Sequence, residues 1–127
     1  MKIRTKRVYD QKADGDGVRI LVDRIWPRGM TREKLQADIW QKEAAPSTAL
    51  RKWFRHDPSR WEEFKSRYFS ELDNEPERVG KLLEIASKEP VTLLFSSRDT
   101  RRNQAVVLKE YLILKSREKK MLNNGCF

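Results

Sequence analysis

Apolar residues form short runs in some parts of this chain and recur every three or four residues in others. The runs predict strands, and the recurrence predicts helices. Residues 91–95 form a short, continuous apolar run, and a second run is centred on residues 20–22. Residues 3–9 place Ile3, Val8 and Tyr9 among basic side chains. We therefore predict strands over residues 3–9, 18–25 and 91–95. The first belongs near an edge of the sheet, where charged side chains are tolerated.

The middle of the chain has the spacing of helices. Trp61, Phe64, Tyr68 and Leu72 recur at intervals of three, four and four residues, which puts them on one helix face. The same spacing and the breaks around it predict helices over residues 32–37, 48–54, 58–72, 75–87 and 100–115. Four polar residues stand where a helix N-cap is expected, namely Thr31, Ser47, Asp57 and Asn74.

The order of these elements predicts an α/β fold. Residues 91–95 are continuously apolar, which is typical of a strand that is covered on both faces of a parallel sheet. The long helical connection before it suits a parallel crossover. We expect a single compact α/β domain over residues 1–115, with a small, mostly parallel sheet surrounded by helices. Residues 116–127 are expected to form a basic, loose C-terminal tail.

Composition narrows the classes of function. The chain has 127 residues and a net charge of +9. Residues 1–12 carry +4 and residues 101–127 carry +5, whereas residues 13–100 are neutral. Such basic ends attract nucleic acid, but they also keep a small protein in solution.

Cysteine and histidine usage excludes several kinds of site. One cysteine, Cys126, rules out an internal disulfide, and a single histidine makes a zinc site of the usual kind unexpected. No apolar run approaches the length of a membrane helix. We expect a cytoplasmic protein with no metal, no cofactor and no membrane partner.

The exit of the second predicted strand carries candidate chemistry. Asp23, Arg24 and Arg28 follow its apolar residues, and ligand sites of parallel sheets lie beyond the carboxyl ends of strands. A guanidinium offers a fork of donors that matches carboxylate or phosphate. A neighbouring carboxylate orients that fork or acts as a base. In the alternative, Asp23 pairs with an arginine and only ties down the loop.

A second polar segment follows the last predicted strand. Residues 96–99 read Ser-Ser-Arg-Asp, and Asn103 lies a few residues further on. Free backbone N–H groups at a helix start bind anions, and Arg98 and the hydroxyl groups would add to this. In the alternative, Ser97, Asp99 or Thr100 caps the helix. The segment has too few glycines for a P-loop.

The only histidine, His56, stands just before a predicted helix. Its imidazole suits general acid or base chemistry near neutral pH. Packing or capping at the junction of loop and helix is the interpretation that we favour.

Several segments resemble a known family. They are residues 7–9, 21–29, 45–47, 50–54, 56–58, 67–68, 71–72, 92–94 and 103–108, together with Phe64. With these the chain resembles the YeaO-like family of small bacterial proteins, domain of unknown function 488, from about residue 5 to residue 112. The resemblance implies a compact α/β domain and supplies no reaction. The family often has a histidine where this chain has Arg102, which argues against a mechanism that needs two histidines.

The leading hypothesis is an anion-binding protein for a small phosphorylated or carboxylated metabolite. The three arginines would hold the anion, Asp23 would orient an arginine or act as a base, and the others would position the ligand. The candidate ligand-binding residues are Asp23, Arg24, Arg28, His56, Arg98, Asp99 and Asn103. One alternative is a nucleic-acid-binding module that uses the basic termini, and another is a partner-binding module without a ligand. Whether the protein is an enzyme stays open.

Overall fold

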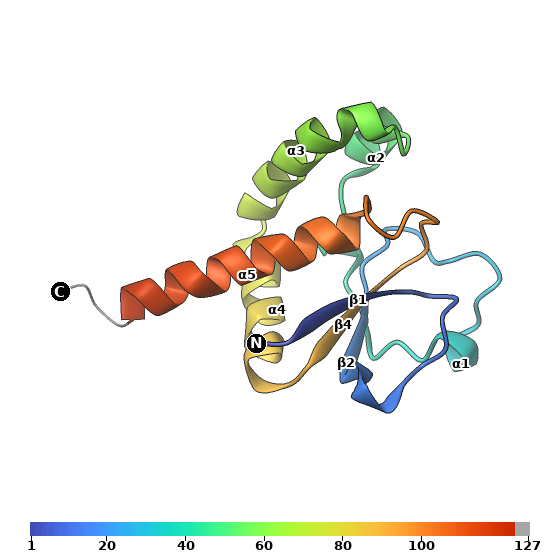
Figure 1. Ribbon diagram of the computed structural model, residues 1–127, viewed down its shortest axis with the longest axis horizontal. Helices are drawn as coiled ribbons and strands as arrows, with labels where there is room; N and C mark the ends of the chain where they lie inside the picture. Colours follow the sequence, from blue (N-terminus) through green and yellow to red (C-terminus); the bar gives the residue numbers. More distant parts are fainter. Residues whose placement is uncertain (124–127) are drawn as a thin grey trace.

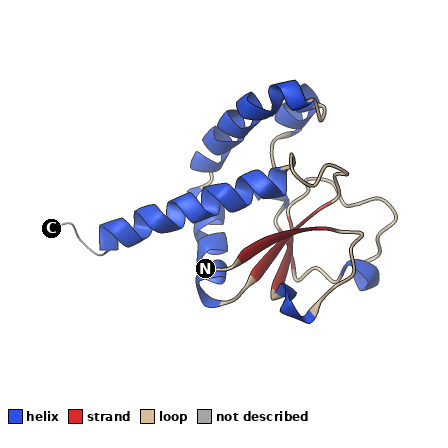
Figure 2. Ribbon diagram, viewed as in Figure 1, coloured by secondary structure: helices blue, strands red, loops and turns tan. Residues whose placement is uncertain are grey.

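Four parallel strands form one sheet in the computed structural model, which describes residues 1–123 (Figures 1 and 2). The order across the sheet is β1-β4-β2-β3, so β1 lies at an edge as predicted. The strands are β1 (Ile3–Arg7), β2 (Val18–Leu21), β3 (Ile39–Trp40) and β4 (Val91–Phe95). β3 was not predicted, because a strand of two residues has no period to detect. β2 ends at Leu21 rather than near Ile25.

Five helices pack around the sheet and complete a single α/β domain. They are α1 (Arg32–Leu35), α2 (Thr48–Phe54), α3 (Trp61–Asp73), α4 (Pro76–Lys88) and α5 (Gln104–Asn123). α5 contacts β1 and β4, and α3 and α4 contact α5 in turn (Figure 1). Among residues 1–123 no helix is both long and apolar enough to cross a membrane.

Most of the predicted helix starts are confirmed. The side chains of Thr31, Ser47 and Asp57 each accept a hydrogen bond from a backbone N–H two or three residues further on. The prediction for Asn74 was wrong, because this residue ends α3 instead of starting α4. Its side-chain amide donates to the carbonyl of Ser70, one helical turn back.

Both ends of the last helix differ from the expectation. α5 begins at Gln104 rather than near Thr100, because the side chain of Asn103 caps it by accepting from the N–H of Val106. The helix continues to Asn123 instead of ending near Lys115. Residues 116–123 of the expected loose tail are therefore helical. Residues 124–127, including Cys126, lie outside the described part of the chain.

The sheet buries both of its faces. One face packs on the helices through alternate side chains, such as Ile20, Leu93 and Phe95. The opposite face holds a smaller cluster around Leu21 and Leu94, which also contains Val8 and Leu35. All five residues of β4 are buried, which confirms the inference from their continuous apolarity.

A buried ion pair lies at the other end of the sheet, where β2 begins. The side chains of Asp16 and Arg19 are each 1% exposed, and the guanidinium lies 2.5 Å from the carboxylate. The ammonium of Lys6 donates to the same carboxylate at 2.8 Å. Burial acts to raise the pKa of Asp16, but hydrogen bonds from Lys6, Ala13 and Arg19 outweigh it and lower the pKa to about 2.

This shift predicts how stability depends on acid. A carboxylate with a depressed folded-state pKa stabilises the fold at pH values above its unfolded pKa of 3.8. We expect a contribution of about 2 kcal/mol to be lost as the pH falls from about 4 to about 2. Urea unfolding measured across this range tests the expectation, with Asp16→Asn as the comparison. If Asp16→Asn loses as much stability as the wild type between about pH 4 and about pH 2, the predicted role of Asp16 is wrong.

Candidate functional site

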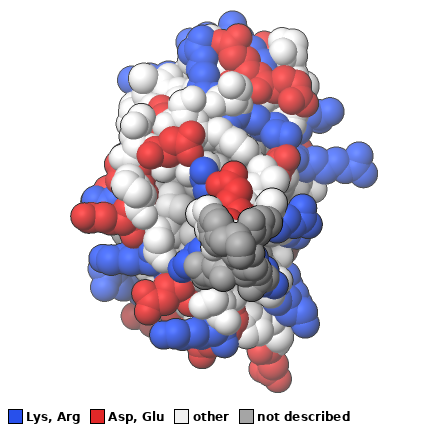
Figure 3. Space-filling model, turned by 90° about the vertical axis from the view of Figure 1, so that its left-hand side faces the viewer, with Lys and Arg blue, Asp and Glu red and all other residues white. Residues whose placement is uncertain are grey.

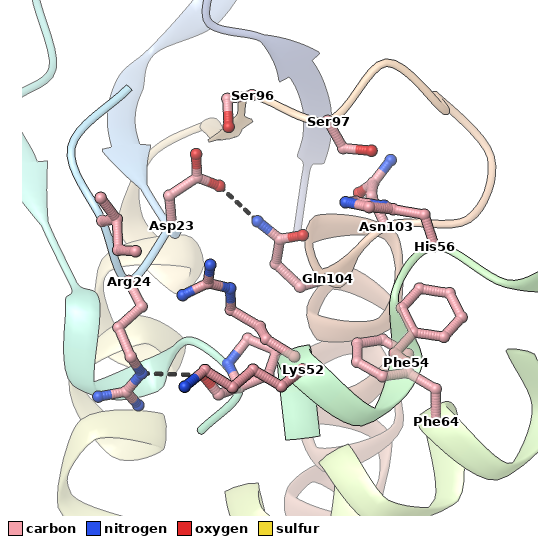
Figure 4. Close-up of a pocket in the computed structure, with 13 residues that line it drawn as sticks. Asp23, Arg24, Lys52, Phe54, His56, Phe64, Ser96, Ser97, Asn103 and Gln104 are labelled. Atoms are coloured by element: carbon pink, nitrogen blue, oxygen red, sulfur yellow. Dashed lines mark hydrogen bonds between the residues drawn. The ribbon is translucent and has the colours of Figure 1, made fainter. Parts of the chain in front are cut away.

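The carboxyl ends of β2 and β4 lie side by side, as expected for parallel neighbours. The two strands pair from Val18 to Leu21, and the N–H of Val22 extends the ladder by donating to the carbonyl of Leu94. A cavity of about 350 Å³ opens at this end of the sheet (Figure 4). Its walls are formed by the segment after β2, by α2 and His56, and by the segment that leads from β4 into α5.

Asp23 is a buried carboxyl on the wall of this cavity. It is 7% exposed, and its carboxylate accepts a hydrogen bond from the side-chain amide of Gln104 (Figure 4). Burial raises the pKa of Asp23, while Ser96, Gln104 and the positive charge of Arg51 act in the opposite direction. Its backbone carbonyl accepts from the indole of Trp40. Asp23 thus joins the end of β2 to the first turn of α5.

Arg24 also lines the cavity, but most of its donor fork is already used. Its Nε donates to the carbonyl of Pro46 at 2.8 Å, and one terminal nitrogen donates to the carbonyl of Ala45 at 2.9 Å. Figure 4 shows its guanidinium pointing away from Asp23. The loop is therefore tied down by Arg24 binding backbone carbonyls, not by an ion pair between Asp23 and an arginine.

The segment after β4 is held by its own hydrogen bonds. Asp99 accepts from the N–H groups of Arg101 and Arg102, which keeps the pKa of Asp99 below its usual value. The amide of Asn103 donates to the carbonyl of Asp99 while its oxygen caps α5. Asn103 lines the cavity and Asp99 does not. The side chains of both are occupied in shaping this loop.

His56 lines the cavity in an unusual backbone conformation. Its φ is 56° and that of the preceding Arg55 is 51°, a left-handed geometry that side chains disfavour. Two such residues in succession turn the chain sharply at the end of α2, and the imidazole lies 6.1 Å from the ring of Phe54. Strain of this kind is concentrated at functional sites.

Two of the predicted arginines stay outside the cavity. Arg28 and Arg98 are both exposed, and neither is part of the cavity lining. The phenol of Tyr9 donates to the backbone carbonyl of Arg28, so that residue belongs to a different part of the surface. The structure brings together Asp23, Arg24, His56 and Asn103, but not Arg28, Arg98 or Asp99.

Two cations that the sequence did not single out line the cavity instead. Arg51 and Lys52 project from the exposed side of α2, and Figure 4 shows Lys52 at the cavity. Phe54 of the same helix stacks on Phe64 of α3 with ring centroids 4.3 Å apart, which packs α2 against α3. The only hint in the sequence was that residues 50–54 belong to the segments resembling the YeaO-like family.

Basic side chains do not gather into one positive patch on the face of the molecule where α5 ends (Figure 3). Figure 3 shows basic and acidic side chains interspersed on the face from which the end of α5 projects. Lys115 illustrates this mixing, since its ammonium lies 3.7 Å from Asp73 and 3.3 Å from Glu118. Nucleic-acid binding by the termini stays a prediction. Within residues 1–123 no group of three or more histidine, cysteine or acidic residues is arranged to hold a metal ion.

Comparison with known proteins gives consistent matches over nearly the whole chain. The family described as "Inactive DUF488-N3 subclade" matches residues 2–126. The chain is 45% identical over 112 residues to the uncharacterized protein YeaO of Escherichia coli (strain K12), which covers 88% of this chain and 97% of that protein.

Mycobacterial proteins are also similar. The chain is 39% identical over 111 residues to the uncharacterized proteins Rv3073c of Mycobacterium tuberculosis (strain ATCC 25618 / H37Rv) and Mb3100c of Mycobacterium bovis (strain ATCC BAA-935 / AF2122/97). These matches cover 87% of this chain and 93% of each relative. No solved structure matches the chain.

Proposed function

Because the chain belongs to the DUF488 family, in the subclade described as inactive, we propose that it binds a small anionic metabolite without converting it. The metabolite is phosphorylated or carboxylated, and it occupies the cavity at the carboxyl ends of β2 and β4. The description of the subclade favours retention of a ligand over turnover. The cavity volume of about 350 Å³ is in the range of small-molecule sites.

The observation that carries the proposal is the state of Arg51 and Lys52. Both line the cavity, and neither forms an ion pair or a side-chain hydrogen bond with another residue in the described part of the chain. Asp23 is the only acidic residue in the lining, against Arg24, Arg51 and Lys52. Unpaired cations that face a cavity attract an anion, and a guanidinium can bind it through two parallel hydrogen bonds.

Further cations and hydroxyl groups support an anionic ligand. Arg55 and Arg101 are exposed in the two segments that border the cavity and, like Arg98, form no ion pair with any residue among 1–123. They raise the positive potential around the opening and so the rate of anion capture. The hydroxyl group of Ser97 accepts from the N–H of Asp99, which leaves its own proton free to donate to a ligand.

The proposal predicts specific stabilisation by phosphate. At about ten times the dissociation constant, a ligand of the folded state adds about 1.4 kcal/mol, which raises Tm by about 5 °C in a domain of this size. Phosphate should therefore raise Tm more than chloride does at equal ionic strength. The double variant Arg51→Gln/Lys52→Gln should lose this excess. Differential scanning fluorimetry measures it.

Two matched variants make the test discriminating. Lys81→Gln removes an exposed cation of α4 remote from the cavity lining and should leave the excess unchanged. Since phosphate also stabilises by exclusion from protein surfaces, only the difference between variants counts. Loss of the excess in Arg98→Gln but not in the double variant would contradict the assignment. Binding of a short DNA duplex that survives about 200 mM salt and requires Arg117, Lys119 and Lys120 would also contradict the assignment.

A further inference from the structure

We infer that the ligand of this cavity is bifunctional, with an amino or amide N–H donor that binds Asp23 and an anionic group that binds Arg51 and Lys52. The inference deepens the proposed function and rests on it. It excludes simple anions, such as inorganic phosphate or an alkyl phosphate, as the natural ligand. It includes amino-group-bearing phosphates or carboxylates and nucleotides whose base carries an amino group.

The first argument is that no cation forms an ion pair with the Asp23 carboxylate. It is buried at 7% exposure and lines the cavity, yet within residues 1–123 no lysine, arginine or histidine nitrogen lies within 4.0 Å of its oxygens. Arg24, its neighbour, uses its donors on backbone carbonyls instead. Buried carboxylates are normally paired with a cation or satisfied by several donors, because desolvation is costly. Asp23 is instead held by neutral donors of Ser96 and Gln104, so its negative charge has no cationic partner at the cavity.

The second argument is that the groups beside Asp23 add another acceptor. An ionised carboxylate offers about four lone-pair sites. The amide of Gln104 and the hydroxyl and backbone N–H groups of Ser96, which faces Asp23 in Figure 4, take up about three of these sites and leave about one for a ligand. Because the amide nitrogen of Gln104 donates to Asp23, its carbonyl oxygen remains as a further acceptor. No donor among residues 1–123 occupies that oxygen.

These acceptors set the orientation of the ligand. A phosphate or carboxylate placed against Asp23 would meet like charge, whereas an N–H donor would complete its hydrogen bonds. The anionic group belongs with Arg51 and Lys52, whose donors are free. Phe54 and Phe64 also line the cavity and present apolar surface to the carbon framework of a ligand.

The test uses pairs of ligands that differ only in the donor. The first pair is phosphoethanolamine against ethyl phosphate, and the second is adenosine 5′-monophosphate against purine riboside 5′-monophosphate, which lacks the amino group. Isothermal titration calorimetry on the full chain gives each dissociation constant. We expect the amino member to bind at least tenfold more tightly in one pair. Which pair shows the preference distinguishes a small aliphatic ligand from a nucleotide.

The sign of the preference is decisive in the first pair. Arg51 and Lys52 alone would bind phosphoethanolamine more weakly than ethyl phosphate, because its ammonium group is repelled by both cations. Tighter binding therefore requires a group such as Asp23. In Asp23→Asn, shown to be folded by circular dichroism, the preference should fall below threefold while the partners without the amino group bind at least as well as to the wild type.

The outcomes separate the two proposals. If both members of each pair bind the wild-type chain equally, and the double variant Arg51→Gln/Lys52→Gln binds neither, the anion site stands and this inference is overturned. If no member of either pair binds the wild type, both the inference and the proposed function are overturned. The wild-type comparison is conclusive even where Asp23→Asn does not fold.

Discussion

Replacing Gly17 with alanine is expected to destabilise the protein by about 3 kcal/mol or more, a large part of the stability of a domain this size. Gly17 has a φ of 66°, which disfavours any side chain, and an added Cβ would lie 2.1 Å from the carbonyl oxygen of Pro90. That carbonyl accepts the N–H of Val18 at 2.9 Å where β2 joins β4. The backbone cannot relieve the clash without breaking the start of this parallel pairing.

Two other glycines serve as controls. Gly29 has a φ of 78° but open space around its Cβ position, so Gly29→Ala measures backbone strain alone, at about 1 kcal/mol. Gly80 lies inside α4 with nothing within 4 Å, so Gly80→Ala should stabilise the helix by up to about 1 kcal/mol. Urea unfolding compares the three variants. A loss in Gly17→Ala no larger than in Gly29→Ala would contradict the predicted clash.

Replacing Arg19 with methionine should cost about 3–5 kcal/mol, the usual result of removing one partner of a buried ion pair. Arg19 is 1% exposed and binds the Asp16 carboxylate. Its other donors bind the carbonyls of Gln36 and Leu35 at 3.1 and 2.8 Å, at the end of α1. Methionine fills a similar volume, so the loss of stability comes mainly from polar groups left without a partner and not from a cavity.

The measurement is a double-mutant cycle with Asp16→Asn. Each single variant leaves one buried partner without the other, although Asp16 keeps its ion pair with Lys6 in Arg19→Met. The double variant removes both buried charges, so it should lose clearly less than the sum of the single losses. Lys88→Met provides the exposed counterpart, because Lys88 and Glu84 are 70% and 69% exposed and their pairing should contribute less than about 1 kcal/mol. Strict additivity in the cycle would show that Asp16 and Arg19 do not stabilise each other.

Local patterns predicted most of the elements of this fold. Short apolar runs identified β2 and β4, and apolar residues among basic ones identified β1, because the pattern of apolar side chains records which faces are buried. Caps such as Ser47 were found because an N-cap acts within three residues of chain. β3 was missed because two residues have no period. Asn74 was misassigned because one polar side chain suits the end of a helix as well as the start.

The pairing of the strand ends could also be anticipated. A buried, continuously apolar β4 implied a parallel sheet, and parallel neighbours bring their carboxyl ends to one edge. This placed Asp23 and the segment after β4 together, as the structure has them. The family resemblance agreed with the fold but did not indicate which side chains face the cavity.

Only the tertiary structure decided which cations line the cavity. Arg51 and Lys52 belong to the exposed side of α2, and their periodicity is the same whether that side faces solvent or a cavity. Their position depends on the packing of Phe54 against Phe64 of α3. Arg24 donates instead to the backbone carbonyls of Ala45 and Pro46, which lie 21 and 22 residues further along the chain. Local spacing encodes the buried face of each element. The surface that a polar face meets is set by packing between elements distant in the chain, which spacing does not record.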